Sequence, residues 1–211
     1  MILYLIRHGE SMSNVHKTFT GQQDAPLTDL GHMQADAICR YFLGIHIDRI
    51  YASDLSRAYE TAVPLSKVSR VPIEKNAAFR EINGGKWENQ KFTELTDLYP
   101  EDYARWRYDL ANARPTGGES IREICKRVCG GIDAIAKAHP EETVVVATHA
   151  VPIRVMLSNW LTGGVDEIDK TVWQPNASIT KVEYKDGKYN PLEIGITAHL
   201  EDMITNLPDK I

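Results

Sequence analysis

The sequence predicts an α/β protein, a three-layer sandwich built on a mostly parallel sheet with an antiparallel edge. Short β-rich runs alternate with segments of helical spacing through most of the 211 residues. The runs 2–6 and 143–147 are continuously apolar, which is typical of strands buried on both faces of a parallel sheet. Near the end of the chain, Asp186-Gly187 separates two further β-rich runs, which favours a type I′ hairpin and hence the antiparallel edge.

The first half of the chain continues the alternation after the run 2–6. Segment 28–44 has apolar residues at helical spacing, begins with a threonine suited to capping and ends at a glycine. A strand is predicted over 49–52, and Ser53 directly after it is expected to be the N-cap of the next helix. Pro64 is expected to kink or end that helix.

The second half predicts two further helices and the hairpin. Segment 120–139 places isoleucines and valines three or four residues apart, which indicates an amphipathic helix that Pro140 closes. A helix is expected after the run 143–147, extending to Gly163. The β-rich runs 178–184 and 188–194 form the expected hairpin.

An aromatic-rich segment at about 87–116 interrupts this pattern. Its tryptophans and tyrosines are interleaved with charges and lack a β period, so we interpret it as a helical insertion over the active site. Two interpretations stay open: a solvated excursion with its own small core, or a lid that shapes the substrate pocket. No internal repeat or linker divides the chain, so we expect one domain over 1–211.

Composition excludes several classes of protein. With 24 Lys and Arg against 29 Asp and Glu, the net charge is −5, so a dedicated nucleic-acid binder is not expected. The chain has no signal-peptide pattern and no apolar run of membrane-spanning length, and its three cysteines contain no CxxC motif. We therefore expect a cytoplasmic protein without a membrane partner. The sequence does not indicate an oligomeric state.

The end of the first strand carries the segment Arg7-His8-Gly9-Glu10. In open α/β sheets, ligands bind beyond the carboxyl ends of the strands. A neutral His8 offers one ring nitrogen as a nucleophile, and Arg7 offers a planar fork suited to phosphate oxygens. Each residue alone is more typical of a structural role, such as a charged surface turn.

Three more side chains are expected near His8. His149 follows the buried run 143–147, so both histidines are predicted at the same edge of the sheet. Arg57 lies in the first turn of the helix after the second strand. Glu81, after a short strand-like run around Phe79, is the best candidate for the acid that a leaving alkoxide needs. Taken singly, each could be structural or solvated.

Together these residues favour phosphoryl transfer. Two histidines and two arginines in one crevice suit a tetrahedral anion, with His8 attacking in line while His149 and the arginines spread the equatorial charge. A phosphate dianion beside Glu81 would raise the pKa of its carboxyl, letting it act first as acid and then as base.

Six motifs in this order resemble the histidine phosphatase superfamily, which has the phosphoglycerate mutase-like fold. They cover nearly the whole chain and read LIRHGESMSN, FTGQQDAPLTDLG, YASDLSRAYETA, FREINGGKWE, PTGGES and VVATHAVPIR. The resemblance implies a phosphomonoester hydrolase that forms a phosphohistidine on a small phosphorylated metabolite, with neither metal nor cofactor. It also implies roles for particular residues: His8 as nucleophile, Arg7, Arg57 and His149 as phosphate pocket, Glu81 as proton donor, and Asn14, Thr20 and Gly21 near the phosphate or substrate.

Two positions depart from the family pattern. Ala150 stands where a glycine commonly follows the second histidine, and a positive φ there would cost about 1–2 kcal/mol. Asn89 stands where glycine is frequent in the FGxWEG pattern, which leaves substrate contacts near Lys86 undetermined.

Two alternatives remain beside the phosphatase. Cofactor-dependent phosphoglycerate mutases carry an ERHYG-like segment after the catalytic glutamate and a paired Arg-Arg in the insertion. Here the corresponding segments are 81–85, EINGG, and Arg105-Trp106-Arg107, closer to phosphatases of the α-ribazole phosphatase type. A non-catalytic phosphate-sensing or interaction protein should have a broken pocket, whereas all five pocket residues are present.

Overall fold

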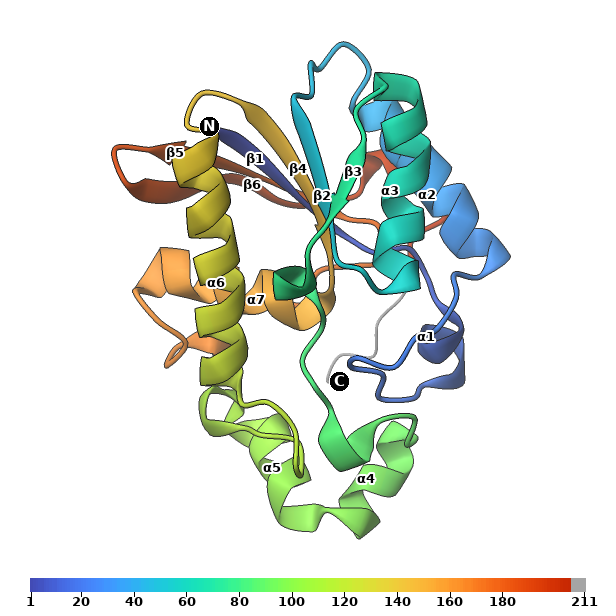
Figure 1. Cartoon of the computed structure of the whole chain (residues 1–211). Coiled ribbons are helices and arrows are strands. Elements are labelled where there is room, and N and C mark those ends of the chain that lie inside the picture. Colours follow the sequence, from blue (N-terminus) through green and yellow to red (C-terminus); the bar gives the residue numbers. More distant parts are fainter. Residues whose placement is uncertain (206–211) are drawn as a thin grey trace.

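The computed structural model describes residues 1–205, in which six strands form one sheet in the order β3-β2-β4-β1-β5-β6 (Figure 1). Four neighbouring strands run parallel: β3 (Ile73–Lys75), β2 (Arg49–Ala52), β4 (Thr143–Thr148) and β1 (Ile2–Arg7). The hairpin of β5 (Ile179–Lys185) and β6 (Lys188–Ile196) adds the antiparallel edge. Asp186 and Gly187 both have positive φ, as a type I′ turn requires. The predicted sheet is confirmed.

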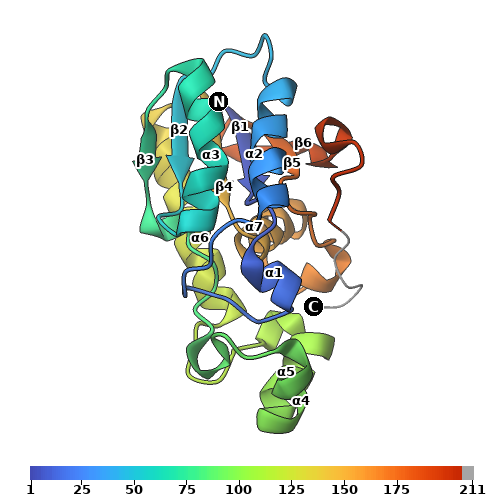
Figure 2. The same ribbon diagram turned by 90° about the vertical axis from the view of Figure 1, so that its right-hand side faces the viewer.

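Helices cover both faces of this sheet (Figures 1 and 2). Leu3 and Leu5 of β1 pack into one buried cluster with α6 (Ile121–Ala138) and α7 (Ala150–Thr162). The alternate residues Tyr4 and Ile6 pack into a second cluster with α2 (Asp29–Tyr41) and α3 (Ser56–Ser69). Because side chains alternate between the faces of a strand, the apolar run over residues 2–6 of β1 requires a helical layer on each side.

Local capping explains where two of these helices begin. The Thr28 hydroxyl accepts a hydrogen bond from the Gly31 amide at 3.0 Å, as predicted for the start of α2. Ser120 and Glu123 form a reciprocal capping box at the start of α6. The predicted amphipathic helix therefore forms with the expected boundaries.

Two local expectations, at Ser53 and at Phe79, were wrong, and Pro64 does not end its helix. Helix α3 begins at Ser56 with Leu55 as N-cap, and the Ser53 hydroxyl bonds the His149 ring instead. Pro64 lies inside α3, which continues to Ser69 because buried side chains of this stretch pack against the sheet. Phe79 belongs to a 3₁₀ turn rather than to a strand-like run.

The insertion is helical, as predicted, and lies beyond the end of the sheet toward which the parallel strands point (Figures 1 and 2). It contains α4 (Phe92–Leu98) and α5 (Pro100–Tyr108), and the short α1 (Met12–His16) lies nearby. Trp87 is fully buried and contacts Phe19 and Trp106 edge-to-face, with ring centroids 5.3 and 5.8 Å apart. These aromatic side chains belong to the same buried cluster as Leu3, α6 and α7, so the insertion packs onto the main core.

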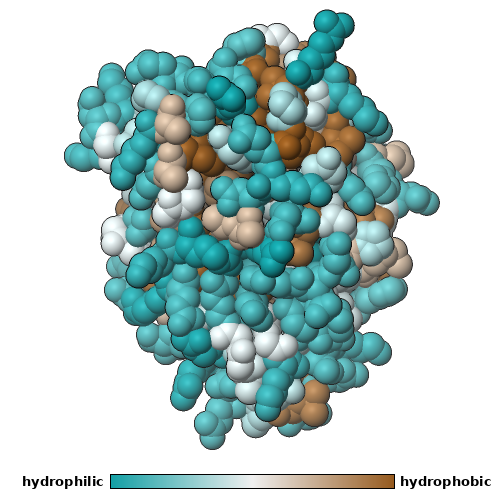
Figure 3. Space-filling view, in the orientation of Figure 1, coloured by the Kyte–Doolittle hydropathy of each residue, from teal (hydrophilic) through white to brown (hydrophobic). Residues whose placement is uncertain are grey.

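Hydrophilic residues cover most of the molecular face shown in Figure 3, and hydrophobic ones gather mainly near its upper end. Within residues 1–205, every helix is too short or too polar to cross a lipid bilayer.

Candidate active site

The predicted site residues meet at the carboxyl ends of the parallel strands. His8 directly follows β1, His149 directly follows β4, and Arg57 lies in the first turn of α3. The rings of His8 and His149 are 5.2 Å apart between centroids. Beside them is a pocket of about 380 Å³. Its lining includes most of the predicted residues: Arg7, His8, Asn14, Thr20, Arg57 and Glu81.

The His8 ring is held with one nitrogen free for attack. Its Nδ1 is 2.7 Å from the Gly9 carbonyl oxygen, which accepts only, so Nδ1 carries the proton and donates. In the neutral ring, Nε2 therefore carries no proton, and its lone pair is free to attack. Burial, with the neighbouring guanidinium groups of Arg57 and Arg7, holds the pKa of His8 well below its usual value. The imidazole is thus neutral near pH 7.

The Ser53 hydroxyl orients the His149 ring. It accepts from the Leu55 amide at 3.3 Å and lies 2.9 Å from His149 Nε2. When the hydroxyl donates its proton to Nε2, the ring proton lies on Nδ1, the same tautomer as in His8. That Nδ1 is buried and has no hydrogen-bond partner among residues 1–205. Burial also lowers the pKa of His149 well below its usual value.

Two buried guanidinium groups supply the positive charge of the pocket. Arg57 donates to the Gly21 and Gln23 carbonyls at 2.7 and 3.0 Å. Arg7 donates through Nη1 to the Gln174 carbonyl, while its buried Nε has no hydrogen-bond partner within the described chain. Burial lowers the pKa of Arg7 to about 10, so it remains charged at pH 7.

Glu81 is the buried carboxylate facing these cations. Its two oxygens accept from the amides of Ile82 and Val151, at 2.9 and 3.4 Å. Burial raises the pKa of Glu81, an effect that these amides and the two guanidinium groups partly offset. The carboxyl therefore keeps its proton to a higher pH than an exposed glutamate would.

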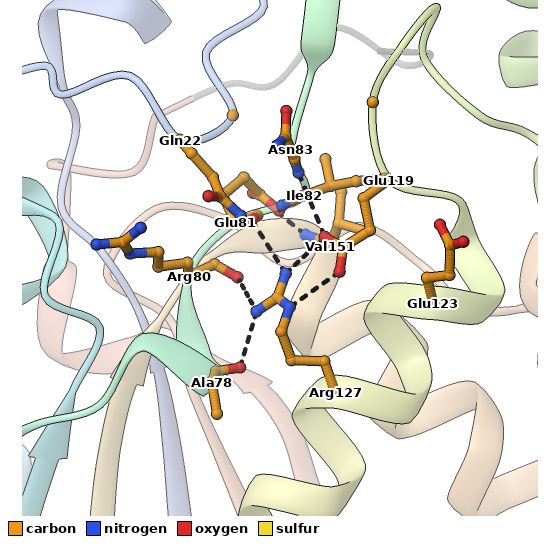
Figure 4. Close-up of polar contacts among 12 residues, drawn as sticks. Gln22, Ala78, Arg80, Glu81, Ile82, Asn83, Glu119, Glu123, Arg127 and Val151 are labelled. Carbon is orange, nitrogen blue, oxygen red and sulfur yellow. Dashed lines mark hydrogen bonds and ion pairs between the residues drawn. The ribbon is translucent and has the colours of Figure 1, made fainter.

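A clamp that the sequence did not reveal fixes the segment carrying Glu81 (Figure 4). Arg127 of α6 donates to the carbonyls of Ala78, Arg80 and Glu81 at 2.9 to 3.2 Å. The same guanidinium pairs with both oxygens of Glu119 at 2.9 and 2.7 Å. Figure 4 shows the Arg127 side chain reaching from α6 into the bend of this segment, so the backbone at Glu81 is held by a charged group.

The predicted residues Asn14, Thr20 and Gly21 lie on α1 and on the loop that follows it. Asn14 and Thr20 line the pocket, while Gly21 is not among its lining residues and its carbonyl accepts a hydrogen bond from Arg57. A Cβ at Gly21 would lie 2.1 Å from the Ile82 carbonyl oxygen, so only glycine allows this approach. The Glu88 carboxylate accepts from several amides of this loop, including that of Gly21 at 2.9 Å. Glu88 is a second supporting residue; it lies in the motif FREINGGKWE, but its role was not predicted from the sequence.

The two departures from the family pattern are accommodated. Ala150 is the first residue of α7 and does not have a positive φ, so its Cβ causes no strain. Asn89 has φ of 63°, in the left-handed region that asparagine tolerates better than most residues.

The fold and this arrangement of paired histidines and arginines define an α/β protein with a cationic pocket at the carboxyl ends of its parallel strands. The chain belongs to the histidine phosphatase superfamily (branch 1), whose family model matches residues 3–197. The family expected from the six motifs is confirmed.

Relatives extend over almost the full length. The chain is 33% identical over 201 residues to phosphoserine phosphatase 1 of Hydrogenobacter thermophilus, covering 94% of this chain and 93% of that protein. It is 28% identical to the probable phosphoglycerate mutase GpmB of Yersinia pestis, covering 94% of each. Among solved structures, the α-ribazole phosphatase of Shigella flexneri superposes with a TM-score of 0.84 at 22% identity, covering 93% of this chain and 96% of that one, a likeness that shows the fold.

Proposed function

We propose that the protein is a phosphomonoesterase that transfers a phosphoryl group from a small phosphorylated metabolite to His8 and then to water. One observation carries the proposal. Beside a neutral His8 with an unprotonated Nε2, two buried nitrogens, His149 Nδ1 and Arg7 Nε, have no hydrogen-bond partner among residues 1–205. Buried donors without partners are costly, and the oxygens of a bound phosphate would satisfy them.

In the first step, His8 Nε2 attacks phosphorus in line with the ester oxygen. The new N–P bond forms as the P–O bond to the leaving alcohol breaks, and Glu81 gives its proton to the departing alkoxide. Arg7, Arg57 and His149 hold the equatorial oxygens, whose charge increases in the transition state. The Nδ2 amide of Asn14 is placed to donate as well, because its Oδ1 already accepts from Ser11 and Asn176.

The second step releases the phosphoryl group from His8. Glu81, now ionised, takes a proton from water as the water oxygen attacks phosphorus. The N–P bond breaks, inorganic phosphate leaves and Glu81 is again protonated. One carboxyl thus serves both steps, because the proton it gives to the leaving alcohol is replaced by one taken from the attacking water.

Arg57 and His149 stabilise the transferring group in this mechanism, so alanine at either position is expected to lower kcat by about 10²–10³-fold. Circular dichroism and steady-state kinetics on p-nitrophenyl phosphate measure the effect. Arg122→Ala, which removes an exposed guanidinium on α6, is the matched control and should keep normal kcat. A folded Arg57→Ala enzyme with near-normal kcat would contradict the assignment.

Net hydrolysis should exceed mutase activity. A mutase must hold a bisphosphorylated intermediate and keep water from the phosphoenzyme, which requires additional cations around the pocket. Arg105 pairs with Asp102 at 3.7 Å, and neither Arg105 nor Arg107 lines the active-site pocket, so they do not form a joint clamp there.

A side-by-side assay tests this point. It compares conversion of 3-phosphoglycerate to 2-phosphoglycerate, primed with 2,3-bisphosphoglycerate, with phosphate release from a panel of monoesters. We expect hydrolysis of the best monoester to be the faster reaction. Isomerisation faster than hydrolysis of every monoester would establish the mutase. If the protein catalyses neither reaction, a non-catalytic phosphate binder would be favoured.

A further inference from the structure

A second depression adjoins the active-site pocket. This basic groove, of about 700 Å³, lies between the end of α1 and the α4–α5 insertion. Lys17 and Phe92 line both the active-site pocket and the groove, so the two spaces share a wall. A molecule with its phosphate beside His8 that reaches these two residues is therefore at the border of the groove.

The shared wall is held by backbone hydrogen bonds. The Phe92 amide donates to the Lys17 carbonyl at 3.1 Å, and Thr18 and Lys91 form an antiparallel bridge. The Phe19 amide adds a bond to the Gln90 carbonyl at 2.8 Å. This ladder connects the loop after α1 to the start of α4, so both lysines extend from a fixed backbone.

The lining of the groove is basic and aromatic. Its described residues include no carboxylate, although the chain as a whole has a net charge of −5. Within residues 1–205, neither Lys17 nor Lys91 forms an ion pair with a carboxylate. The side chains that carry or can acquire positive charge are His16, Lys17, Lys91 and Arg107.

The pocket between this groove and His8 is different in character. Away from the phosphate end, aromatic and aliphatic side chains dominate its walls: Phe19, Ile82, Phe92, Trp106, Val151 and Trp173. An apolar passage with buried cations at one end and exposed cations at the other complements an elongated molecule with two anionic ends.

We propose that the groove binds an anionic group, carboxylate or phosphate, carried by the alcohol part of the substrate and separated from the transferred phosphoryl group by an apolar or planar spacer. This inference rests on the phosphomonoesterase activity proposed above and assigns its substrate class. Lys17 and Lys91 are the specificity-determining residues, and they act on substrate binding rather than on the chemical step.

The test compares ω-carboxyalkyl phosphates with n-alkyl phosphates of matched chain length. The wild-type enzyme should prefer the carboxylated ester above a minimum length, with kcat/KM about three- to tenfold higher, the range expected for one or two partly solvated ion pairs. The preference should lie in KM and should diminish as salt screens the pair. A parallel series of alkanediol bisphosphates shows whether phosphate or carboxylate is the better distal group.

The double variant Lys17→Gln/Lys91→Gln should remove the preference. The single variant Lys91→Gln, whose residue lines the groove but not the active-site pocket, should reduce the preference and leave hydrolysis of n-alkyl phosphates and p-nitrophenyl phosphate unchanged. Glutamine retains Cβ, so the strain at Lys17, whose φ is 53°, is the same in both proteins. Lys126→Gln/Lys137→Gln, with two exposed lysines of α6, removes the same charge elsewhere and should keep the preference.

Two results would overturn the inference and leave the proposed phosphatase activity in place. One is an equal kcat/KM for both ester series at every chain length, and the other is a preference that survives in the double variant. Absence of p-nitrophenyl phosphate hydrolysis by the wild-type enzyme would instead overturn the proposed function, and the groove assignment with it.

Discussion

Replacing His8 by alanine is expected to abolish the phosphoenzyme and lower kcat by about 10⁴–10⁶-fold, the range seen when a covalent nucleophile is lost. The reason is geometric and electronic. The Gly9 carbonyl fixes the Nδ1 proton, and burial beside Arg57 and Arg7 keeps the ring neutral, so Nε2 is a ready nucleophile. No other described side chain duplicates this position, since His149 Nε2 is engaged by Ser53.

Rapid-quench labelling with a radiolabelled monoester measures this effect directly. A phosphohistidine is labile in acid and survives base, so the trapped label should disappear in acid and persist in base for the wild type. His8→Ala should trap none. The control His32→Ala changes an exposed histidine of α2 and should be labelled normally. An active His8→Ala enzyme carrying the same label would remove His8 from the role of nucleophile.

Much of the fold could be predicted because its signals are local and periodic. The uninterrupted apolar run of β1 requires cover on both faces, and the Asp186-Gly187 pair permits the two positive φ angles of a tight hairpin. The helix begun by Ser120 continues through Gly130-Gly131, because its apolar face is buried on the sheet.

The errors arose where tertiary contacts compete with local preference. Ser53 has the chemistry of an N-cap, yet its hydroxyl orients His149, a residue 96 positions away along the chain. A proline inside a helix destabilises it by about 3 kcal/mol, yet α3 stays helical through Pro64 because the buried neighbours of Pro64 pack against the sheet. Neither contact has a signature in the surrounding sequence.

The same distinction applies to the site. His8 and His149 could be found because each follows a recognisable strand, and parallel strands end at the same edge. Arg127 could not, because in sequence it is one cation among several on an amphipathic helix. Its partners are backbone carbonyls of a turn, which any sequence possesses. Supporting residues of this kind become visible only when the chain is folded.

Glu81→Gln is expected to separate substrates by their leaving groups. Glutamine keeps the shape of the side chain and an acceptor oxygen for the Ile82 amide, but it has no acidic proton to give. Phosphorylation of the enzyme by an alkyl phosphate should slow by about 10²–10⁴-fold, because an alkoxide leaves poorly without protonation. Phosphorylation by p-nitrophenyl phosphate should change by less than about tenfold, because that leaving group is stable as an anion.

The pH profile provides a second signature of the same carboxyl. Glu81 acts as an acid only while protonated, and burial raises its pKa. Phosphorylation by an alkyl phosphate should therefore be fastest at low pH and decline as pH rises through this raised pKa. The pKa of His8 is held well below its usual value, so the ring is already neutral near pH 7. In Glu81→Gln, the decline should disappear.

Single-turnover phosphorylation, followed by rapid quench across pH, distinguishes these expectations from a general loss of structure. Glu141→Gln, which neutralises an exposed carboxylate outside the pocket, should behave as the wild type with both substrates. A misfolded variant would lose both activities in proportion, whereas loss of the acid alone leaves the p-nitrophenyl phosphate reaction largely intact. If a folded Glu81→Gln enzyme slows equally with both esters and retains the wild-type pH profile, the proton must come from another group.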